Sequence, residues 1–367
     1  MKEIYVTKPF LPPLNEYIQE LEEIWSRGIL TNGGPEYLRF KEGLQKYLGI
    51  HNVSMFTNGH IALETAIKSL NLTGEVITTP FTFISTTHAI INNNLTPVFC
   101  DIKKEDYTID EEKIEKLITE KTSAIVPVHV YGYPCNIDKI EQIAKKYNLK
   151  VIYDAAHAFG VKINNQSIFN YGDLSMCSFH ATKVFNTIEG GMISTKNSSL
   201  IEKIEILKNY GITSPETIDE IGTNGKMSEF QAAMGVASLK YCDKIINRRK
   251  ELTMQYKEKL SNIQGIKLCE EKDNITYNYA YMPILLNEKY GISRNELYDR
   301  LKEHGVYSRK YFYPLTNMVS CYKNKYVDAN IPNATYVANH ILTLPLYPDL
   351  KDEEVELITK IIKNRGK

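Results

Sequence analysis

The sequence predicts an α/β protein in which a large domain with a mostly parallel sheet is followed by a smaller C-terminal α/β domain. The first observation is that short β-rich runs alternate with amphipathic helical runs from about residue 53 to 200. The second is that the β-rich runs are continuously apolar, as in a parallel sheet covered by helices on both faces. The third is the length of 367 residues, which exceeds what one compact core usually holds.

Two helices are expected before the alternation begins. Residues 15–48 have helical periodicity, and the glycine-rich run at residues 31–35 divides them into two helices. The strands predicted after these helices cover residues 53–56, 76–79, 98–101, 124–130, 151–154, 174–179 and 192–195. Amphipathic stretches such as residues 137–144 lie between many of these strands and supply the helical crossovers.

The C-terminal third has a different pattern. A helical run from Ser228 to about Asp243 is followed by a Lys/Arg-rich helix over residues 247–260, which links to the second domain. The capping-box pattern Ser293 to Glu296 predicts a helix that ends near His304. Short strands are expected around Val306 and Leu342. We therefore predict a large domain at residues 1–243, including an N-terminal arm, and a small domain at residues 244–367.

Composition excludes several classes of protein. Lys plus Arg equals Asp plus Glu at 44 each, and no basic stretch interleaves with aromatic residues, so we expect no nucleic-acid partner. No apolar run approaches the length of a membrane span or a signal core, so we expect a cytoplasmic protein without a membrane partner. The six scattered cysteines fit reduced thiols. No zinc spacing, dinucleotide fingerprint or Walker motif is present, and no metal is expected.

A lysine and an aspartate stand out at the ends of predicted strands. Lys183 follows the apolar run 174–179 and precedes the Gly190-Gly191 pair, a setting in which an amine can be partly desolvated for Schiff-base chemistry. Asp154 ends the strand 151–154. A lysine with a carboxylate is the combination that pyridoxal 5′-phosphate (PLP) needs, because the acid keeps the ring nitrogen protonated. Read alone, the same residues also fit an exposed lysine and a helix-capping aspartate.

Several residues, most of them polar, fall at or near the ends of predicted strands. The carboxyl ends of parallel strands line the ligand crevice of such folds. The residues in question are Asn58, Phe83, Asp101, His129, Asp154 and Ser178. The turn at residues 57–60 opens a predicted helix and could bind phosphate through its backbone N–H groups, with Ser178 adding a hydroxyl. Phe83 could stack on a pyridine ring. An ordinary strand-to-helix turn fits the first feature equally well, and most phenylalanines in such a setting are core residues.

Taken together, these segments resemble the DegT/StrS sugar aminotransferases. The resemblance covers nearly the whole chain in the family's order. Its segments are residues 30–35 (LTNGGP), 57–63 (TNGHIAL), 154–160 (DAAHAFG), 178–183 (SFHATK), 189–191 (EGG), 222–228 (GTNGKMS) and 344–348 (LPLYP). It implies a PLP enzyme of the aspartate aminotransferase-like fold type I, working as a homodimer with active sites at the subunit interface.

The resemblance also implies a role for particular residues. Lys183 would carry the cofactor covalently as a Schiff base, and Asp154 would pair with its ring nitrogen. The remaining cofactor-binding residues would be His157 at the ring oxygen, Phe83 stacked on the ring, and Gly59, His60, Ser178 and the partner subunit's Asn224 at the phosphate. Two positions depart from the family: His60 replaces the usual Thr, and Gly225-Lys226 replaces a common Tyr-Arg pair. Lys226, Tyr311 and Tyr313 are candidates for contacting the substrate.

The stretch around Lys183, residues 180–191, is most similar to family members that make dTDP-4-amino-4,6-dideoxyglucose for surface polysaccharides such as the O antigen of lipopolysaccharide. This implies amine transfer from L-glutamate to a 4-keto-6-deoxy sugar. The alternatives are a 3-aminotransferase acting on a dTDP-3-keto sugar and an aminotransferase acting on a UDP-linked 4-keto sugar. A PLP sugar dehydratase and a non-catalytic sensor are further alternatives. The dehydratases carry His in place of the lysine, and a sensor would be expected to lose Lys183 or Asp154.

Overall fold

The computed structural model describes residues 3–322, 325–326 and 329–364, and within them a seven-stranded sheet forms the centre of the large domain. Its strands, in spatial order, are β2 (Asn52–Phe56), β10 (Gly191–Thr195), β9 (Leu174–Ser178), β6 (Lys150–Asp154), β5 (Thr122–Val126), β3 (Glu75–Thr78) and β4 (Thr96–Phe99). Strand β10 is antiparallel to both neighbours, and the other adjacent pairs are parallel. Each of the seven strands predicted from the sequence overlaps one of these.

Helices cover both faces of this sheet, as the apolar strands predict. Alternate residues of β6 show the two faces, because Val151 and Tyr153 belong to one core cluster and Ile152 to another. The first cluster includes residues of α2 (Pro35–Leu48), α6 (Ile137–Tyr147) and α8 (Glu229–Leu239). The second includes residues of α3 (Gly59–Ser69), α4 (Ile84–Asn92) and α7 (Ser198–Lys208). The fold is therefore a three-layer α/β arrangement, which confirms the predicted class.

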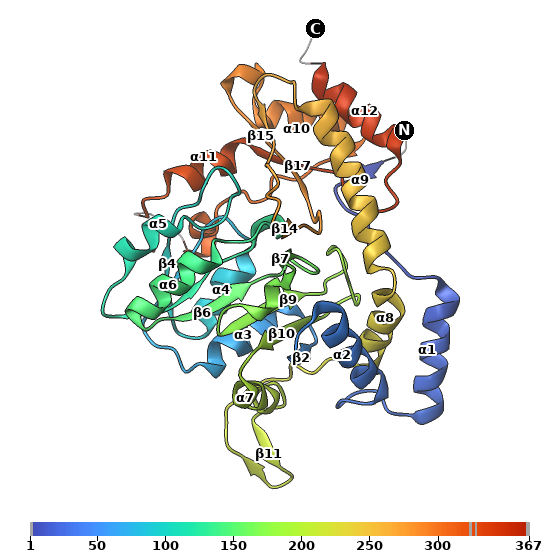
Figure 1. Cartoon of the computed structure of the whole chain (residues 1–367), viewed down its shortest axis with the longest axis vertical. Helices are drawn as coiled ribbons and strands as arrows, with labels where there is room; N and C mark the ends of the chain where they lie inside the picture. The colour runs from blue at the N-terminus through green and yellow to red at the C-terminus, as the bar shows by residue number, and fades with distance from the viewer. Residues whose placement is uncertain (1–2, 323–324, 327–328, 365–367) are drawn as a thin grey trace.

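A second unit lies above the sheet in Figure 1. Its antiparallel sheet has the order β13 (Ile266–Lys267), β15 (Met282–Leu286) and β17 (Ile341–Leu344). A core of its own contains residues of α9 (Cys242–Leu260), α10 (Arg294–Glu303) and α12 (Asp352–Lys363). The capping box at Ser293 and Glu296 is present at the start of α10. The proposed division between residues 243 and 244 falls in the first turn of α9.

The N-terminal strand belongs to this second unit. Strand β1 (Ile4–Tyr5) pairs in parallel with β16 (Val306–Tyr307), and Ile4 is buried in the second core. The chain then returns through α1 (Leu14–Arg27), which packs against α8 of the large domain. Other short elements are β7 (Lys162–Ile163), β8 (Gln166–Ser167), β14 (Ile275–Thr276), α5 (Glu111–Ile114) and α11 (Pro332–His340).

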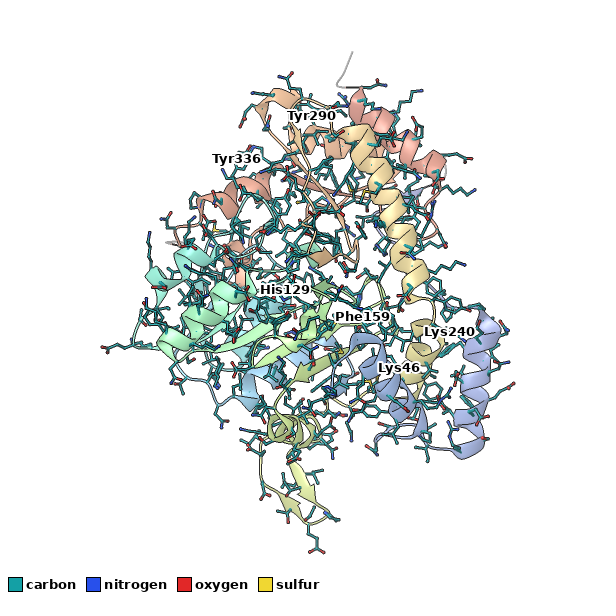
Figure 2. All side chains as sticks on the ribbon, in the orientation of Figure 1. Lys46, His129, Phe159, Lys240, Tyr290 and Tyr336 are labelled. Atoms are coloured by element: carbon teal, nitrogen blue, oxygen red, sulfur yellow. The ribbon has the colours of Figure 1, made fainter. Side chains whose placement is uncertain are left out.

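A hairpin of β11 (Ile212–Ser214) and β12 (Thr217–Ile218) projects from the body between α7 and α8 (Figure 1). Apolar residues here are exposed: Ile218 in β12 has 69% of its full exposure, and Ile221, which follows the hairpin, has 82%. Elsewhere, side chains fill the space between sheet and helices, and Figure 2 shows His129 and Phe159 in this interior. Across the residues that the structure covers, no helix has the length and apolar character needed to cross a bilayer.

Candidate active site

A cleft of about 530 Å³ opens at the carboxyl ends of β6 and β9, where α3 and α4 begin. This is the edge at which open α/β sheets bind their ligands. The predicted site residues that line it are Gly59, His60, Phe83, Asp154, His157, Ser178, Lys183 and Tyr311. Phe83 is 58% exposed although it is a large aromatic residue, so its ring is available to cover a bound molecule.

Asp154 is the last residue of β6 and places a buried carboxylate at this edge. Its Oδ2 accepts a hydrogen bond from Thr86 Oγ1 at 2.7 Å, and its Oδ1 accepts one from the Ala156 backbone N–H at 3.1 Å. Burial raises the pKa of Asp154, while the hydrogen bonds from Thr86 and Ala156 and the positive charge of Lys183 oppose that rise. A cationic group bound in the cleft would stabilise the ionised carboxylate further.

His157 is held neutral with its proton on a defined nitrogen. The Tyr131 backbone N–H donates to His157 Nδ1 at 3.1 Å, so the ring proton is on Nε2. Burial lowers the pKa of His157 well below its usual value, and the charge of Lys183 lowers it further. The ring stacks on Phe312, with centroids 5.8 Å apart and planes 4° apart. His157 can therefore donate one hydrogen bond from Nε2 to a group in the cleft.

Lys183 lies on the loop between β9 and β10, which backbone hydrogen bonds make compact. The Phe179 N–H donates to Gly190 O at 2.8 Å, and the Thr187 N–H donates to Phe179 O at 2.9 Å. The Lys183 N–H donates to His180 O at 2.9 Å. The lysine is half-buried in the wall of the cleft. Its positive charge acts to lower the pKa of both Asp154 and His157. A flexible amine beside a buried carboxylate can form a covalent bond to a carbonyl and move a proton.

The start of α3 is shaped for close approach of the backbone. Asn58 caps the helix by accepting the Ile61 N–H at 2.9 Å. A Cβ added at Gly59 would lie 2.8 Å from Ser178 Cβ, and one at Gly191 would lie 2.7 Å from the Gly59 nitrogen. Only glycine fits at either place, so the end of β9 and the start of β10 both pack directly against the start of α3. Backbone N–H groups at a helix N-terminus together with the Ser178 hydroxyl suit a phosphate.

The remaining three candidate residues do not line this cleft. Asn224 is exposed and forms an isolated bridge with Asn209. Lys226 Nζ donates to Asn209 Oδ1 at 2.9 Å. Tyr313 is half-exposed, with the Arg294 guanidinium 5.1 Å from its ring centroid.

Sequence reasoning missed several residues that shape the cleft. Thr86 holds Asp154, Ser85 and Glu64 contact the two ring nitrogens of His60, and Tyr281 and Phe312 form part of the wall. Thr82 lies just before α4, and Ser85 and Thr86 lie in its first turn, so a run of hydroxyl residues after a predicted strand is the signal that marks them in the sequence.

A buried carboxylate at a strand end, a neutral histidine donor, a half-buried lysine and a phosphate-shaped helix start define a site that fits PLP, on the fold of the type I aminotransferases. The chain belongs to the DegT/DnrJ/EryC1/StrS aminotransferase family, whose model matches residues 14–363. This confirms the resemblance and makes the protein a PLP-dependent sugar aminotransferase. When bound, PLP supplies the carbonyl and the electron-withdrawing ring on which amine transfer depends.

Individual relatives are similar over nearly their whole lengths. The chain is 44% identical over 362 residues to a dTDP-4-amino-4,6-dideoxy-D-glucose transaminase of Shigella dysenteriae, with 99% of each chain covered. It is 43% identical over 369 residues to a protein of the same name from Escherichia coli, with 98% of each covered. The crystal structure of DesI in the presence of its TDP-sugar product superposes with a TM-score of 0.94 at 30% identity, covering 99% of this chain and 93% of DesI.

Proposed function

We propose that this protein transfers the amino group of L-glutamate to C4 of dTDP-4-keto-6-deoxy-D-glucose, giving dTDP-4-amino-4,6-dideoxy-D-glucose. The observation that carries the proposal is the identity of 44% and 43%, over nearly the full length, to two transaminases named for this product. The proposal places the reaction in the cytoplasm, as a step toward surface polysaccharide such as the O antigen.

Within this proposal the cleft residues divide the work. Lys183 anchors the cofactor, and Asp154 pairs with its ring nitrogen. His157 donates its Nε2–H to the ring oxygen, and the exposed ring of Phe83 covers one face. Gly59, His60 and Ser178 surround the phosphate.

Lys183 has a second task after the substrate amine displaces it. Its free amine would then accept the proton from the substrate carbon that bears the nitrogen and would return it on the cofactor side of that nitrogen, acting as general base and then general acid. The compact loop between β9 and β10 keeps the lysine backbone in place during this transfer. The amino group would remain with the bound cofactor after glutamate leaves as 2-oxoglutarate, and the keto sugar would accept that amino group by the same route in reverse.

A homodimer completes the site in this proposal. Asn224 lies outside the cleft of its own subunit, on the segment that joins the β11–β12 hairpin to α8. Ile218 in β12 and Ile221 on that segment expose apolar surface that a partner subunit can cover. We propose that Asn224 binds the cofactor phosphate of the partner's site, and that Lys226 with Tyr311 and Tyr313 contacts the nucleotide sugar.

A shared site predicts complementation between two inactive subunits. Co-expression of Lys183→Ala with Asn224→Ala subunits should produce heterodimers that are active, because one of their two sites keeps both residues. The Lys183→Ala variant alone should be inactive, and the Asn224→Ala variant alone should be weak. The measurement is amine transfer by heterodimers isolated with two different affinity tags. Inactive heterodimers of confirmed composition would show that Asn224 and Lys183 serve the same subunit's site.

The substrate proposal is tested by a coupled assay. We expect amination when dTDP-glucose and its 4,6-dehydratase are supplied, and NMR of the product should show an equatorial amine at C4. A parallel reaction adds a 3,4-ketoisomerase. Product that forms only in the parallel reaction would reject C4 amination and support the 3-aminotransferase alternative. A UDP-linked keto sugar in a third reaction tests the choice of nucleotide.

A further inference from the structure

Three side chains form a continuous polar chain at the edge of the cleft. His60 Nε2 lies 3.1 Å from Glu64 Oε1, one turn further along α3. His60 Nδ1 lies 2.8 Å from Ser85 Oγ, in the first turn of α4. His60 and Ser85 line the cleft beside Gly59, where the helix start suits a phosphate. Both ring nitrogens of His60 are thus engaged, and only the serine hydroxyl can turn toward the cleft.

The protonation state of His60 decides what the Ser85 hydroxyl presents to the cleft. Nε2 faces a carboxylate and must carry a hydrogen. If His60 is neutral, Nδ1 has only a lone pair, so Ser85 donates its hydrogen to the ring and presents oxygen lone pairs to the cleft. If His60 is protonated, Nδ1–H donates to Ser85 Oγ, and the hydroxyl hydrogen becomes free to point into the cleft.

A phosphate ester discriminates between these two states. Its oxygens are acceptors with a charge of nearly −2 at neutral pH, so they repel the lone pairs of the first state. In the second state they gain a hydroxyl donor and a nearby cation. We propose that His60 takes up a proton when the cofactor phosphate binds, and that this proton turns the Ser85 hydroxyl toward the phosphate. The inference rests on the proposed position of the phosphate at the start of α3.

The surroundings favour His60 as the group that takes the proton. The hydrogen bond from His60 lowers the pKa of Glu64, with further help from Asn92 and against the effect of burial, so this carboxylate stays ionised as counter-charge. His88, on α4, is the nearest competitor. Burial lowers the pKa of His88, and the charge of His60 lowers it further, against the opposing effect of Glu64.

The other Asp, Glu, His and Lys side chains that line the cleft are Asp154 at the end of β6, His157 just after it, and three residues on the loop between β9 and β10. The loop residues are His180, Lys183 and Glu189, and His180 Nε2 lies 3.5 Å from Glu189. His180 therefore pairs with Glu189, and His60 pairs with Glu64. Because the two binding events are linked, protonation of His60 raises the affinity for the phosphate by the same factor by which the bound phosphate raises the affinity of His60 for the proton.

Calorimetric titration of the cofactor-free protein tests the inference without measuring activity. Pyridoxamine 5′-phosphate and pyridoxamine are titrated near pH 7.5, where the free phosphate is already a dianion. Buffers with different heats of ionisation give the number of protons bound. We expect the phosphate compound to take up about half a proton or more beyond pyridoxamine, because the proposal links phosphate binding to proton uptake. This comparison uses wild-type protein and needs no variant.

Variants then assign the proton to His60. The extra uptake should disappear in His60→Thr, which keeps a hydroxyl but cannot titrate, and should fall in Glu64→Gln, which removes the counter-charge. His88→Gln is the matched control and should keep the full uptake. The affinity of wild type for the phosphate compound should fall more steeply with rising pH than that of His60→Thr, because only the wild-type protein couples phosphate binding to proton uptake at this position.

The outcomes separate this inference from the proposed function. Equal uptake with pyridoxamine and its phosphate in wild type, or undiminished extra uptake in His60→Thr, would overturn the inference while the cofactor still binds. Loss of the extra uptake in His88→Gln instead would assign the proton to His88 and also overturn it. If the phosphate compound fails to bind the wild-type protein at all, the proposed cofactor site itself is wrong.

Discussion

Replacing Lys183 with alanine is expected to abolish amine transfer, with a loss of about 10⁴-fold or more. The variant loses the covalent anchor of the cofactor and the group that moves the proton, and the described cleft holds no second lysine that could replace it. Cofactor should still bind non-covalently, because the phosphate and ring contacts remain. A small primary amine in solution should restore part of the proton transfer, since it can enter the space that the side chain leaves.

The measurement combines turnover with covalent labelling. Borohydride reduction of wild type should fix the cofactor on the peptide that contains Lys183, and the alanine variant should remain unlabelled. Lys46→Ala, at an exposed lysine on α2 (Figure 2), is the control and should retain both labelling and activity. A label on a different lysine of the wild-type protein would remove Lys183 from its proposed role.

The sheet and its polar edge could be predicted because strand ends are visible in the sequence. Apolar runs of strand length end at Asp154 and Ser178, and the parallel arrangement brings both to one edge. The same rule also selected residues with other tasks. Asp101 accepts the backbone N–H groups of Asn333 and Ala334 at the start of α11, and His129 accepts the Cys135 N–H. A position at a strand end therefore predicts that a residue lies at this edge of the sheet. Whether its side chain faces a ligand or makes a structural contact depends on the packing around it.

The contacts that set the chemistry were not predictable in this way. Thr86 reaches Asp154 across 68 residues of sequence, because α4 packs where β6 ends. The Tyr131 backbone N–H donates to His157 Nδ1 and so fixes the ring proton on Nε2, and a backbone contact of this kind cannot be read from the residue types in the sequence. The two-residue strand β1 is likewise too short to show a period, and it is stabilised by pairing with β16 at the far end of the chain. These features depend on tertiary neighbours rather than on local pattern.

Replacing Asp154 with asparagine is the second change expected to have a large effect. The carboxylate is only 4% exposed and receives two hydrogen bonds, so its position is fixed before any ligand binds. Removing one partner of a buried charge pair costs about 3–5 kcal/mol, which corresponds to about 10²–10⁴ in rate if the pair is needed throughout the reaction. Asparagine has nearly the same shape, so the loss would report on charge rather than packing.

Thr86→Val provides the matched comparison, because it removes one hydrogen bond to Asp154 and keeps the charge. A single hydrogen bond to a charged group is worth about 1.5–3 kcal/mol, so this variant should lose about 10- to 100-fold in turnover, clearly less than Asp154→Asn. Covalent labelling at Lys183 should persist in both variants, because neither removes the amine. The measurements are single-turnover rates with glutamate and the pH dependence of the cofactor absorption band. If Asp154→Asn retained turnover near that of wild type, the cofactor ring would not need the negative charge, and the side chain would serve the fold. Burial raises the pKa of Asp154 and so opposes its charge, which a residue without a charged partner would have no reason to keep.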